Sequence, residues 1–229
     1  MSKTLMILFM FFCTLTVQAG QKKEKVIVTL NDGTTVVGYE VNDLGSGIKN
    51  FFRSTGSIPS FVKVSPQMDG KNAKTYKAKE IKGYIYANDT TRQYESQYFN
   101  ALIPFKTDAK IRGLFQVVKR LPNGTIYTYQ TYSTQDSKNR YVSSLNATYG
   151  VKLRGDDRIY NIIVNGQDDL TYLLLSLSRK GPKQLAEKYK DYFNDKEHQK
   201  EILKDPTIII RLYDEYLKSN PAISRPEKK

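Results

Sequence analysis

Apolar and polar residues alternate along much of the chain between residues 25 and 164, which is the period of strands with one buried face. The clearest case is the pair of segments 25–30 and 34–41, which read KVIVTL and TTVVGYEV. The residues that share a face are Val26, Val28 and Leu30 in the first segment, and Val37, Tyr39 and Val41 in the second. Asn31-Asp32-Gly33 separates the two segments, and Asp and Gly tolerate the positive φ of tight turns, so the pattern predicts a hairpin.

Further short strands are predicted by the same alternation. They are FVKV at 61–64, two elements within 75–89 that meet at a bend near Lys79, TRQYESQYF at 91–99 pairing back on 83–87, the hairpin strands 114–120 and 125–133 around LPNG, and the segments 140–150 and 151–164. In the second hairpin, Tyr127 and Tyr129 lie on one face and Ile126 lies on the other.

The period changes to that of helices after residue 180. Leu185, Tyr189, Tyr192 and Phe193 share one helical face after Pro182, and Ile209, Leu212, Tyr213 and Tyr216 share another after Asp205 and Pro206. Asn220 and Pro221 end the second helix, and a polar stretch containing His198 joins the two. The apolar segment 168–178 fits either a buried strand or the start of a helix.

These elements predict an α+β protein. We expect a mostly antiparallel β domain at 20–178, built as a sheet or a partly open barrel, followed by a small helical cap at 179–220 and a flexible tail at 221–229.

The first residues are typical of a secretory signal peptide, expected at 1–19. Lys3 precedes an apolar run from Leu5 to Leu15, which is shorter than the about 20 residues of a membrane-spanning helix. Val17 and Ala19 supply the small residues that a signal peptidase requires before its cut. Cys13 lies inside the apolar run and follows a phenylalanine, so we do not expect a lipid anchor there.

Removal of the signal would leave a mature chain without cysteine, since Cys13 is the only one. Disulfides, thiol nucleophiles and cysteine metal sites are then excluded, and an exported protein without disulfides favours a bacterial envelope, in the periplasm or at the cell surface. The formal net charge of +13 indicates attraction to anionic surfaces such as phosphate-bearing lipids or polysaccharide. Nucleic acid is not expected as a partner of an exported protein, and no transmembrane helix is expected in the mature chain.

Candidate catalytic chemistry is sparse in this sequence. His198 is the only histidine, so no histidine-based triad or zinc cage is expected, and no catalytic, cofactor or metal residue is assigned. The acid pairs Asp156–Asp157 and Asp168–Asp169 lie in predicted turns, where acids are favoured for backbone reasons. The Arg-Gly-Asp triplet at 154–156 is interpreted as part of such a turn rather than as an adhesion motif.

Two surfaces are weighed as contact sites. Lys71, Lys74, Lys77, Lys79 and Lys82 form a candidate anion-binding surface, although lysines also protect the edge of a sheet against unwanted pairing. Tyr127 and Tyr129 form a candidate aromatic surface for a ligand such as a sugar, and packing within the sheet is the alternative.

The segment VTLNDGTTVVGYEV resembles the first hairpin of SH3-like or Sm-like small barrels. More broadly, this hairpin, the segment from Tyr76 to Tyr84 and the helices between Leu185 and Leu217 resemble β-rich exported proteins of Gram-negative bacteria. The resemblance implies an envelope location and brings no catalytic residue with it.

The sequence therefore favours a non-enzymatic exported protein that binds or scaffolds in the envelope, with an unknown protein or polysaccharide as partner. Two alternatives stay open: an acid-dependent hydrolase of envelope polysaccharide, and a binder of anionic envelope polymer through the basic surface.

The signal peptide generates a direct prediction about the mature protein. Its first residue should be Gly20, and it should carry no acyl group, because cleavage after Ala19 discards Cys13. N-terminal sequencing and intact mass measurement of protein from the envelope fraction test both points. A retained lipid label would contradict them.

Overall fold

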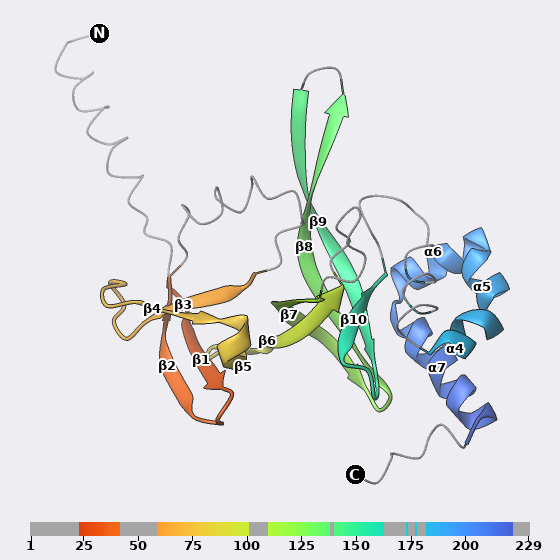
Figure 1. Ribbon diagram of the computed structural model, residues 1–229. Coiled ribbons are helices and arrows are strands. Elements are labelled where there is room, and N and C mark those ends of the chain that lie inside the picture. The colour runs from red at the N-terminus through yellow and green to blue at the C-terminus, as the bar shows by residue number, and fades with distance from the viewer. Residues whose placement is uncertain are drawn as a thin grey trace.

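The computed structural model describes residues 23–41, 59–100, 110–137, 140–162, 173, 177 and 182–221. Ten strands precede a group of short helices (Figure 1). The strands are β1 (Lys25–Leu30), β2 (Thr35–Glu40), β3 (Phe61–Ser65), β4 (Lys74–Lys77), β5 (Ile81–Tyr86), β6 (Asp89–Asn100), β7 (Lys110–Leu121), β8 (Gly124–Ser137), β9 (Arg140–Leu153) and β10 (Arg158–Asn161), and the 3-10 turn η1 (Ala78–Glu80) lies between β4 and β5.

All ten strands belong to one mostly antiparallel sheet, in the order β10-β9-β8-β7-β6-β5-β1-β2-β3-β4. One further pairing is parallel and joins β10 to β6, with Arg158 opposite Tyr98 and Ile159 opposite Phe99. This pairing closes β6 to β10 into a ring of five strands, while β1 to β5 extend from it. The expected β-rich α+β class is confirmed in this form.

Strands β6 and β7 contribute side chains to two hydrophobic cores, one on each side of the sheet. Tyr94 and Leu114 pack with the core of β1 to β5, whereas Phe99 and Phe115 lie in the core enclosed by the ring. Successive side chains of a strand point to opposite faces, so the alternation along these two strands divides their residues between the cores. The sheet therefore curls one way before β6 and the other way after it.

The predicted first hairpin is confirmed, with Lys25 opposite Tyr39 and Thr29 opposite Thr35. Gly33 has a φ of 94°, and the Asp32 carboxylate accepts hydrogen bonds from the backbone N–H and hydroxyl of Thr34. Val26 and Val28 are fully buried, as their shared face predicts. On β2, however, Val36 packs against the core, and Val37 is 49% exposed on the opposite face.

Among the residues described from 182 onward, the helices are α4 (Lys183–Lys188), α5 (Lys190–Asn194), α6 (Lys196–Lys204) and α7 (Thr207–Ser219). The polar stretch around His198, between the two amphipathic helices that the sequence predicts, forms the additional helix α6. The Asp195 carboxylate caps α6 by accepting hydrogen bonds from the backbone N–H groups of Glu197 and His198, and Ile202 anchors it in the core.

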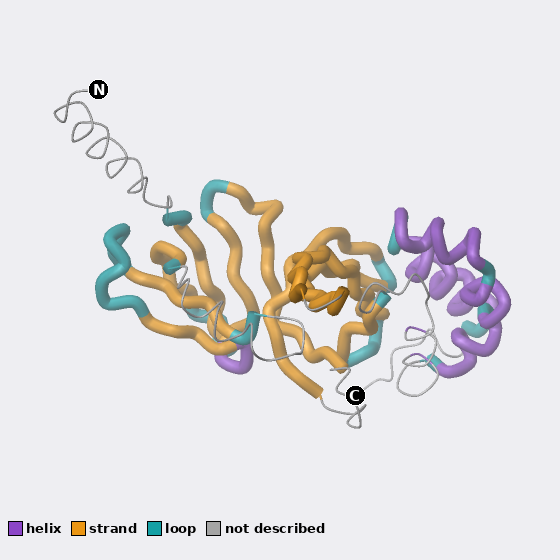
Figure 2. Tube along the Cα trace, turned by 90° about the horizontal axis from the view of Figure 1, so that it is seen from above, coloured by secondary structure: helices purple, strands orange, loops and turns teal. Residues whose placement is uncertain are grey.

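The helices pack on the outer face of the ring, next to β8, β9 and β10. Figure 2 shows them gathered at one end of the molecule. Their shared core includes Ile126 and Val151 from the strands and Ile209 from α7. A Cβ added at Gly124 would lie 2.9 Å from Ile210, so β8 and α7 approach too closely there for a side chain. Leu173 and Leu177, from the segment with ambiguous sequence, are helical and fully buried in the same core.

Strands β8 and β9 continue past the ring as a two-stranded arm (Figure 1). Their pairing runs from Gly124 opposite Leu153 to Ser137 opposite Arg140. Strand β7 pairs with β8 only as far as Thr128, and β10 pairs with β9 at Gly150 and Val151. Within the described strands, the outer part of the arm therefore has no third strand beside it.

Some predicted features lie outside the described residues: the signal peptide with Cys13, Val17 and Ala19, the pair Asp168–Asp169, and the tail after Pro221. Among the described residues, no helix is long and apolar enough to cross a membrane.

The close contact of β5 with β6 at Gly83 generates a stability prediction. A Cβ at this position would lie 2.1 Å from the backbone oxygen of Tyr94, so Gly83→Ala should force the strands apart and lower the free energy of unfolding by about 1–3 kcal/mol. Urea denaturation followed by circular dichroism measures this. The control is Lys82→Ala, an exposed neighbour that should change stability by less than about 0.5 kcal/mol. Equal stabilities of the two variants would contradict the prediction.

Candidate functional site

The inward side chains of the first strands change from aliphatic to charged at one end of the sheet. Along β1 the inward position passes from Val28 and Val26 to Glu24, because all three share the same alternation, and along β2 it passes from Gly38 to Glu40. Tyr86 of β5 lies opposite Val26, which places its ring beside these acids. The aliphatic core thus gives way to carboxylates and tyrosines, which we call the Arg92 cluster: Glu24, Glu40, Tyr86, Arg92, Tyr94 and Gln116.

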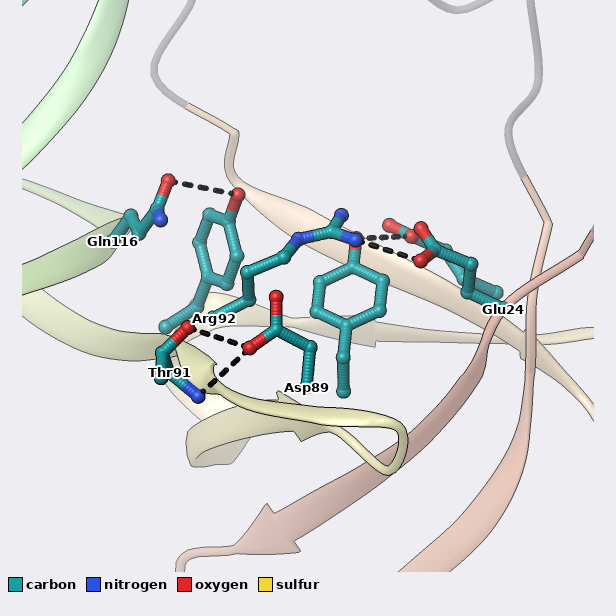
Figure 3. Close-up of polar contacts among 8 residues, drawn as sticks. Glu24, Asp89, Thr91, Arg92 and Gln116 are labelled. Atoms are coloured by element: carbon teal, nitrogen blue, oxygen red, sulfur yellow. Dashed lines mark hydrogen bonds and ion pairs between the residues drawn. The ribbon is translucent and has the colours of Figure 1, made fainter.

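Arg92 holds this cluster together (Figure 3). Its guanidinium carbon lies 3.6 Å from the centre of the Tyr86 ring, and its Nη1 lies 2.7 Å from Oε1 of Glu24. The two charged side chains are 34% and 45% exposed, so the ion pair can be reached from solvent. The turn before Arg92 is fixed by the Asp89 carboxylate, which accepts hydrogen bonds from the backbone N–H and the hydroxyl of Thr91.

Glu40 is the more enclosed acid of the cluster. The hydroxyl of Tyr86 donates a hydrogen bond of 2.5 Å to its Oε2. Burial raises the pKa of Glu40 above its ordinary value, although the Tyr86 hydroxyl and the charge of Arg92 act against this rise. One carboxyl is therefore held beside a guanidinium, and the other is easier to protonate than a free glutamate.

Tyrosines form the floor of the cluster. The rings of Tyr84 and Tyr94 stack in parallel with their centres 4.6 Å apart, and Tyr86 meets both rings edge-on. Tyr94 also lies opposite Gln116 of β7, and its hydroxyl donates to Oε1 of that residue at 3.4 Å (Figure 3). The arrangement offers a guanidinium, two carboxyls, an amide and aromatic faces, which together hydrogen-bond and pack against a polar ligand.

The sequence analysis did not identify this cluster. Arg92 is far from Glu24 and Glu40 along the chain, and the pairings of β6 with β5, of β5 with β1 and of β1 with β2 bring them together. One signal was present, because Glu24 and Glu40 each extend the inward alternation of their strands with an acid.

A second polar cluster lies inside the ring, around Glu95. Arg120 donates to its Oε1 at 2.7 Å, Tyr127 donates to its Oε2 at 2.6 Å, and Gln97 donates at 3.2 Å. Burial alone would raise the pKa of Glu95, but the hydrogen bonds from Arg120 and Tyr127 outweigh it and hold the pKa below its ordinary value. This carboxylate is fully engaged, so we assign it a structural role.

The predicted aromatic surface is not a surface. Tyr127 and Tyr129 do share a face, but they are 1% and 6% exposed because that face lines the inside of the ring. The hydroxyl of Tyr129 on β8 donates to Asn161 of β10, past the intervening strand β9. Both residues are core residues, which agrees with the packing alternative.

The five predicted lysines are all exposed but do not converge. Lys71 pairs with Asp69 at 3.4 Å in a turn. Lys74 and Lys77 lie on β4, the last strand of the sheet order, where lysine protects an exposed edge. Lys79 belongs to η1 and Lys82 to β5. Protection of the sheet edge therefore explains Lys74 and Lys77 better than one anion-binding site shared by all five lysines does.

His198 lies on α6. Its ring stacks on Tyr192 with the ring centres 3.8 Å apart, and its Nδ1 lies 3.5 Å from the Asp195 carboxylate that caps the helix. These contacts tie α6 to α5.

Asp156 lies in the confirmed turn between β9 and β10, where Gly155 has a φ of 89°. Its Oδ2 is buried and has no hydrogen-bond partner among the described residues. Burial raises the pKa of Asp156 to about 6, against a hydrogen bond from Tyr160. The turn also contacts the helical cap, because the hydroxyl of Tyr213 on α7 donates to the backbone oxygen of Arg154 at 3.2 Å.

Comparison of the chain with protein-family models, curated proteins and solved structures found no match. Within the described part of the chain, no three His, Cys, Asp or Glu side chains are grouped so that they could hold a metal ion.

The environment of Asp156 generates a prediction about pH. A carboxyl whose pKa is higher in the folded chain stabilises the fold when it is protonated, so this contribution is complete below the unfolded value of 3.8 and is lost as pH rises through about 6. The melting temperature of wild type, relative to that of Asp156→Asn, should therefore fall between about pH 4 and pH 6 and change little above that range. Scanning calorimetry at several pH values measures the difference, and a difference that does not change with pH would contradict it.

Proposed function

We propose that the protein is an exported, non-enzymatic binding or scaffolding protein of the bacterial envelope, and that it contacts its ligand through the Arg92 cluster. The observation that carries the proposal is the change of the inward face from valines to Glu24, Glu40 and Arg92 at one end of the sheet. Partial burial of a charged group costs desolvation energy, and a solvent-exposed ion pair adds little to stability. Stability therefore does not explain why these charges lie at the end of the sheet, whereas contact with a ligand does.

The chemistry of the cluster favours a polar ligand with several hydrogen-bonding groups. A planar guanidinium and a planar carboxylate each present paired hydrogen-bonding atoms. Arg92 is already oriented by the ring of Tyr86 and by Glu24, so little side-chain entropy is lost when a ligand binds. Envelope polysaccharide and the polar surface of an envelope protein both offer such groups.

A hydrolase of envelope polysaccharide is the second candidate. Glu24 and Glu40 approach the same arginine, and the pKa of Glu40 is raised, as a general acid requires. A glycosidase uses two carboxyls on either side of the scissile bond. The experiment below separates turnover from binding.

The test uses the mature chain from residue 20 onward. Wild type, Arg92→Gln and Glu40→Gln are immobilised and exposed to envelope extract and to a panel of purified envelope polysaccharides, with retained material identified by mass spectrometry and released sugar measured by reducing ends. We expect wild type to retain a partner without releasing sugar. Arg92→Gln should retain at least about tenfold less, because a charge-assisted hydrogen bond contributes about 1.5–3 kcal/mol.

The matched control is Arg120→Gln, which removes an arginine from an ion pair elsewhere in the sheet, with Glu95 at 2.7 Å. It should retain the partner as wild type does. Release of sugar that Glu40→Gln abolishes would replace the binding proposal with the hydrolase. Equal retention by Arg92→Gln and Arg120→Gln would remove the Arg92 cluster from the contact.

A further inference from the structure

The outward face of the first strands differs sharply from the inward face in charge. Glu24 and Glu40 both take inward positions. The outward positions of β1 to β4 are Lys25, Ile27, Thr29, Thr35, Val37, Tyr39, Phe61, Lys63, Ser65, Thr75 and Lys77, and none of them is acidic. Strand register has thus placed Glu24 and Glu40 on the inward side and Lys25, Lys63 and Lys77 on the outward side, whereas Lys74 lies inward, opposite Val64.

An apolar row crosses the middle of this outward face. Val37 lies opposite Ile27, and Ile27 lies opposite Ile85 on the next strand. Val37 is 49% exposed, and the two isoleucines are partly exposed. Side chains directly opposite one another on a sheet are neighbours, so the three form a continuous aliphatic strip across β2, β1 and β5.

Lysines and aromatic side chains flank this strip. Lys25 lies opposite Tyr39 beside the strip, and Lys77 lies opposite Phe61 near the edge of the sheet. Glu24 and Glu40, next to Lys25 and Tyr39 in sequence, take inward positions. Two further acids are in turns: Asp32 binds Thr34, and Glu80 accepts a hydrogen bond from the backbone N–H of Lys77. The side chains of Lys25 and Lys77 are both exposed.

We infer that this face, defined by Lys25, Ile27, Val37, Tyr39, Lys77 and Ile85 and called the lysine face, docks on an anionic lipid bilayer. Lysines near an anionic leaflet gain electrostatic energy, and aliphatic side chains between them gain by entering the headgroup region. The formal net charge of +13 acts in the same direction. This inference does not depend on a ligand at the Arg92 cluster, which lies on the opposite face.

The apolar strip favours a lipid surface over an anionic polysaccharide. An anionic polysaccharide contributes mainly hydroxyl and charged groups, which gain less from contact with Val37, Ile27 and Ile85 than acyl carbon does. A headgroup layer offers phosphate to the lysines and acyl carbon to the strip at the same time. The low exposure of the two isoleucines keeps the contact shallow, as expected for reversible docking.

The chain contains no tryptophan, which provides a direct spectroscopic test. Val37→Trp places the only tryptophan of that variant on the lysine face, and Val118→Trp is the matched control, because Val118 is 51% exposed on β7. The probes are vesicles of equal parts phosphatidylglycerol and phosphatidylcholine, and vesicles of phosphatidylcholine alone. We expect the emission of Val37→Trp to shift to shorter wavelength with the anionic vesicles only, and to return when salt is raised. Val118→Trp should not shift.

Vesicle sedimentation with a second set of variants tests the lysines. The combination of Lys25→Gln and Lys77→Gln should partition about twenty-fivefold less than wild type, because each lysine near an anionic leaflet accounts for about a fivefold change. The control combination is Lys119→Gln with Lys204→Gln, which removes two exposed lysines elsewhere and the same net charge. Circular dichroism confirms folding of every variant.

Three results would overturn the inference: no sedimentation of wild type with anionic vesicles, equal losses in the two lysine combinations, or emission shifts of equal size at the two tryptophan positions. Binding to soluble dextran sulfate without binding to vesicles would assign the lysine face to an anionic polymer instead. Arg92→Gln should sediment with vesicles as wild type does, so failure of the proposed ligand site remains distinguishable from failure of membrane docking.

Discussion

The fold depends on the alternation of side chains along β6 and β7. Ser96 of β6 lies opposite Leu114 of β7 on the side of the first core, and Glu95 lies opposite Phe115 on the side of the ring. A slip of β7 by one residue against β6 would turn the side chains of β7 to the opposite faces, placing Phe115 in the first core and Leu114 inside the ring. The register of this one strand pair therefore determines which side chains enter each of the two cores. The strands β1 to β5 complete the first core, and the strands β8 to β10 complete the core inside the ring.

Local pairing was predictable from the sequence because turn residues and alternation act over short distances. The turns at Asn31-Asp32-Gly33, after Leu121 and at Arg154-Gly155 all join paired strands as expected. The bend near Lys79 is a 3-10 turn, and Asn220 ends the last helix. In each case the residues that determine the geometry are neighbours in the chain, so a single sequence contains the information.

Long-range closure and the choice of inner face were not predictable in the same way. The parallel contact between β10 and β6 joins residues from distant parts of the chain, and no local pattern marks it. Alternation indicates which residues share a face but not which face is inside. For this reason Val36 replaces Val37 as the buried valine of β2, and Tyr127 and Tyr129 are in the core. The Arg92 cluster depends on this same long-range information.

The structure also shows that burial alone does not decide the state of its acids. Glu40 and Glu95 are both half-buried glutamates that accept a hydrogen bond from a tyrosine, yet the pKa of Glu40 is raised and that of Glu95 is lowered. The difference is the arginine: Arg120 bonds directly to Glu95, whereas Arg92 bonds to Glu24 and acts on Glu40 only through its charge. A carboxylate with a directly bonded cation is a stable part of a core, and one without such a bond keeps the capacity to accept a proton or a new partner. This contrast is the physical reason to place the ligand at Glu40 and not at Glu95.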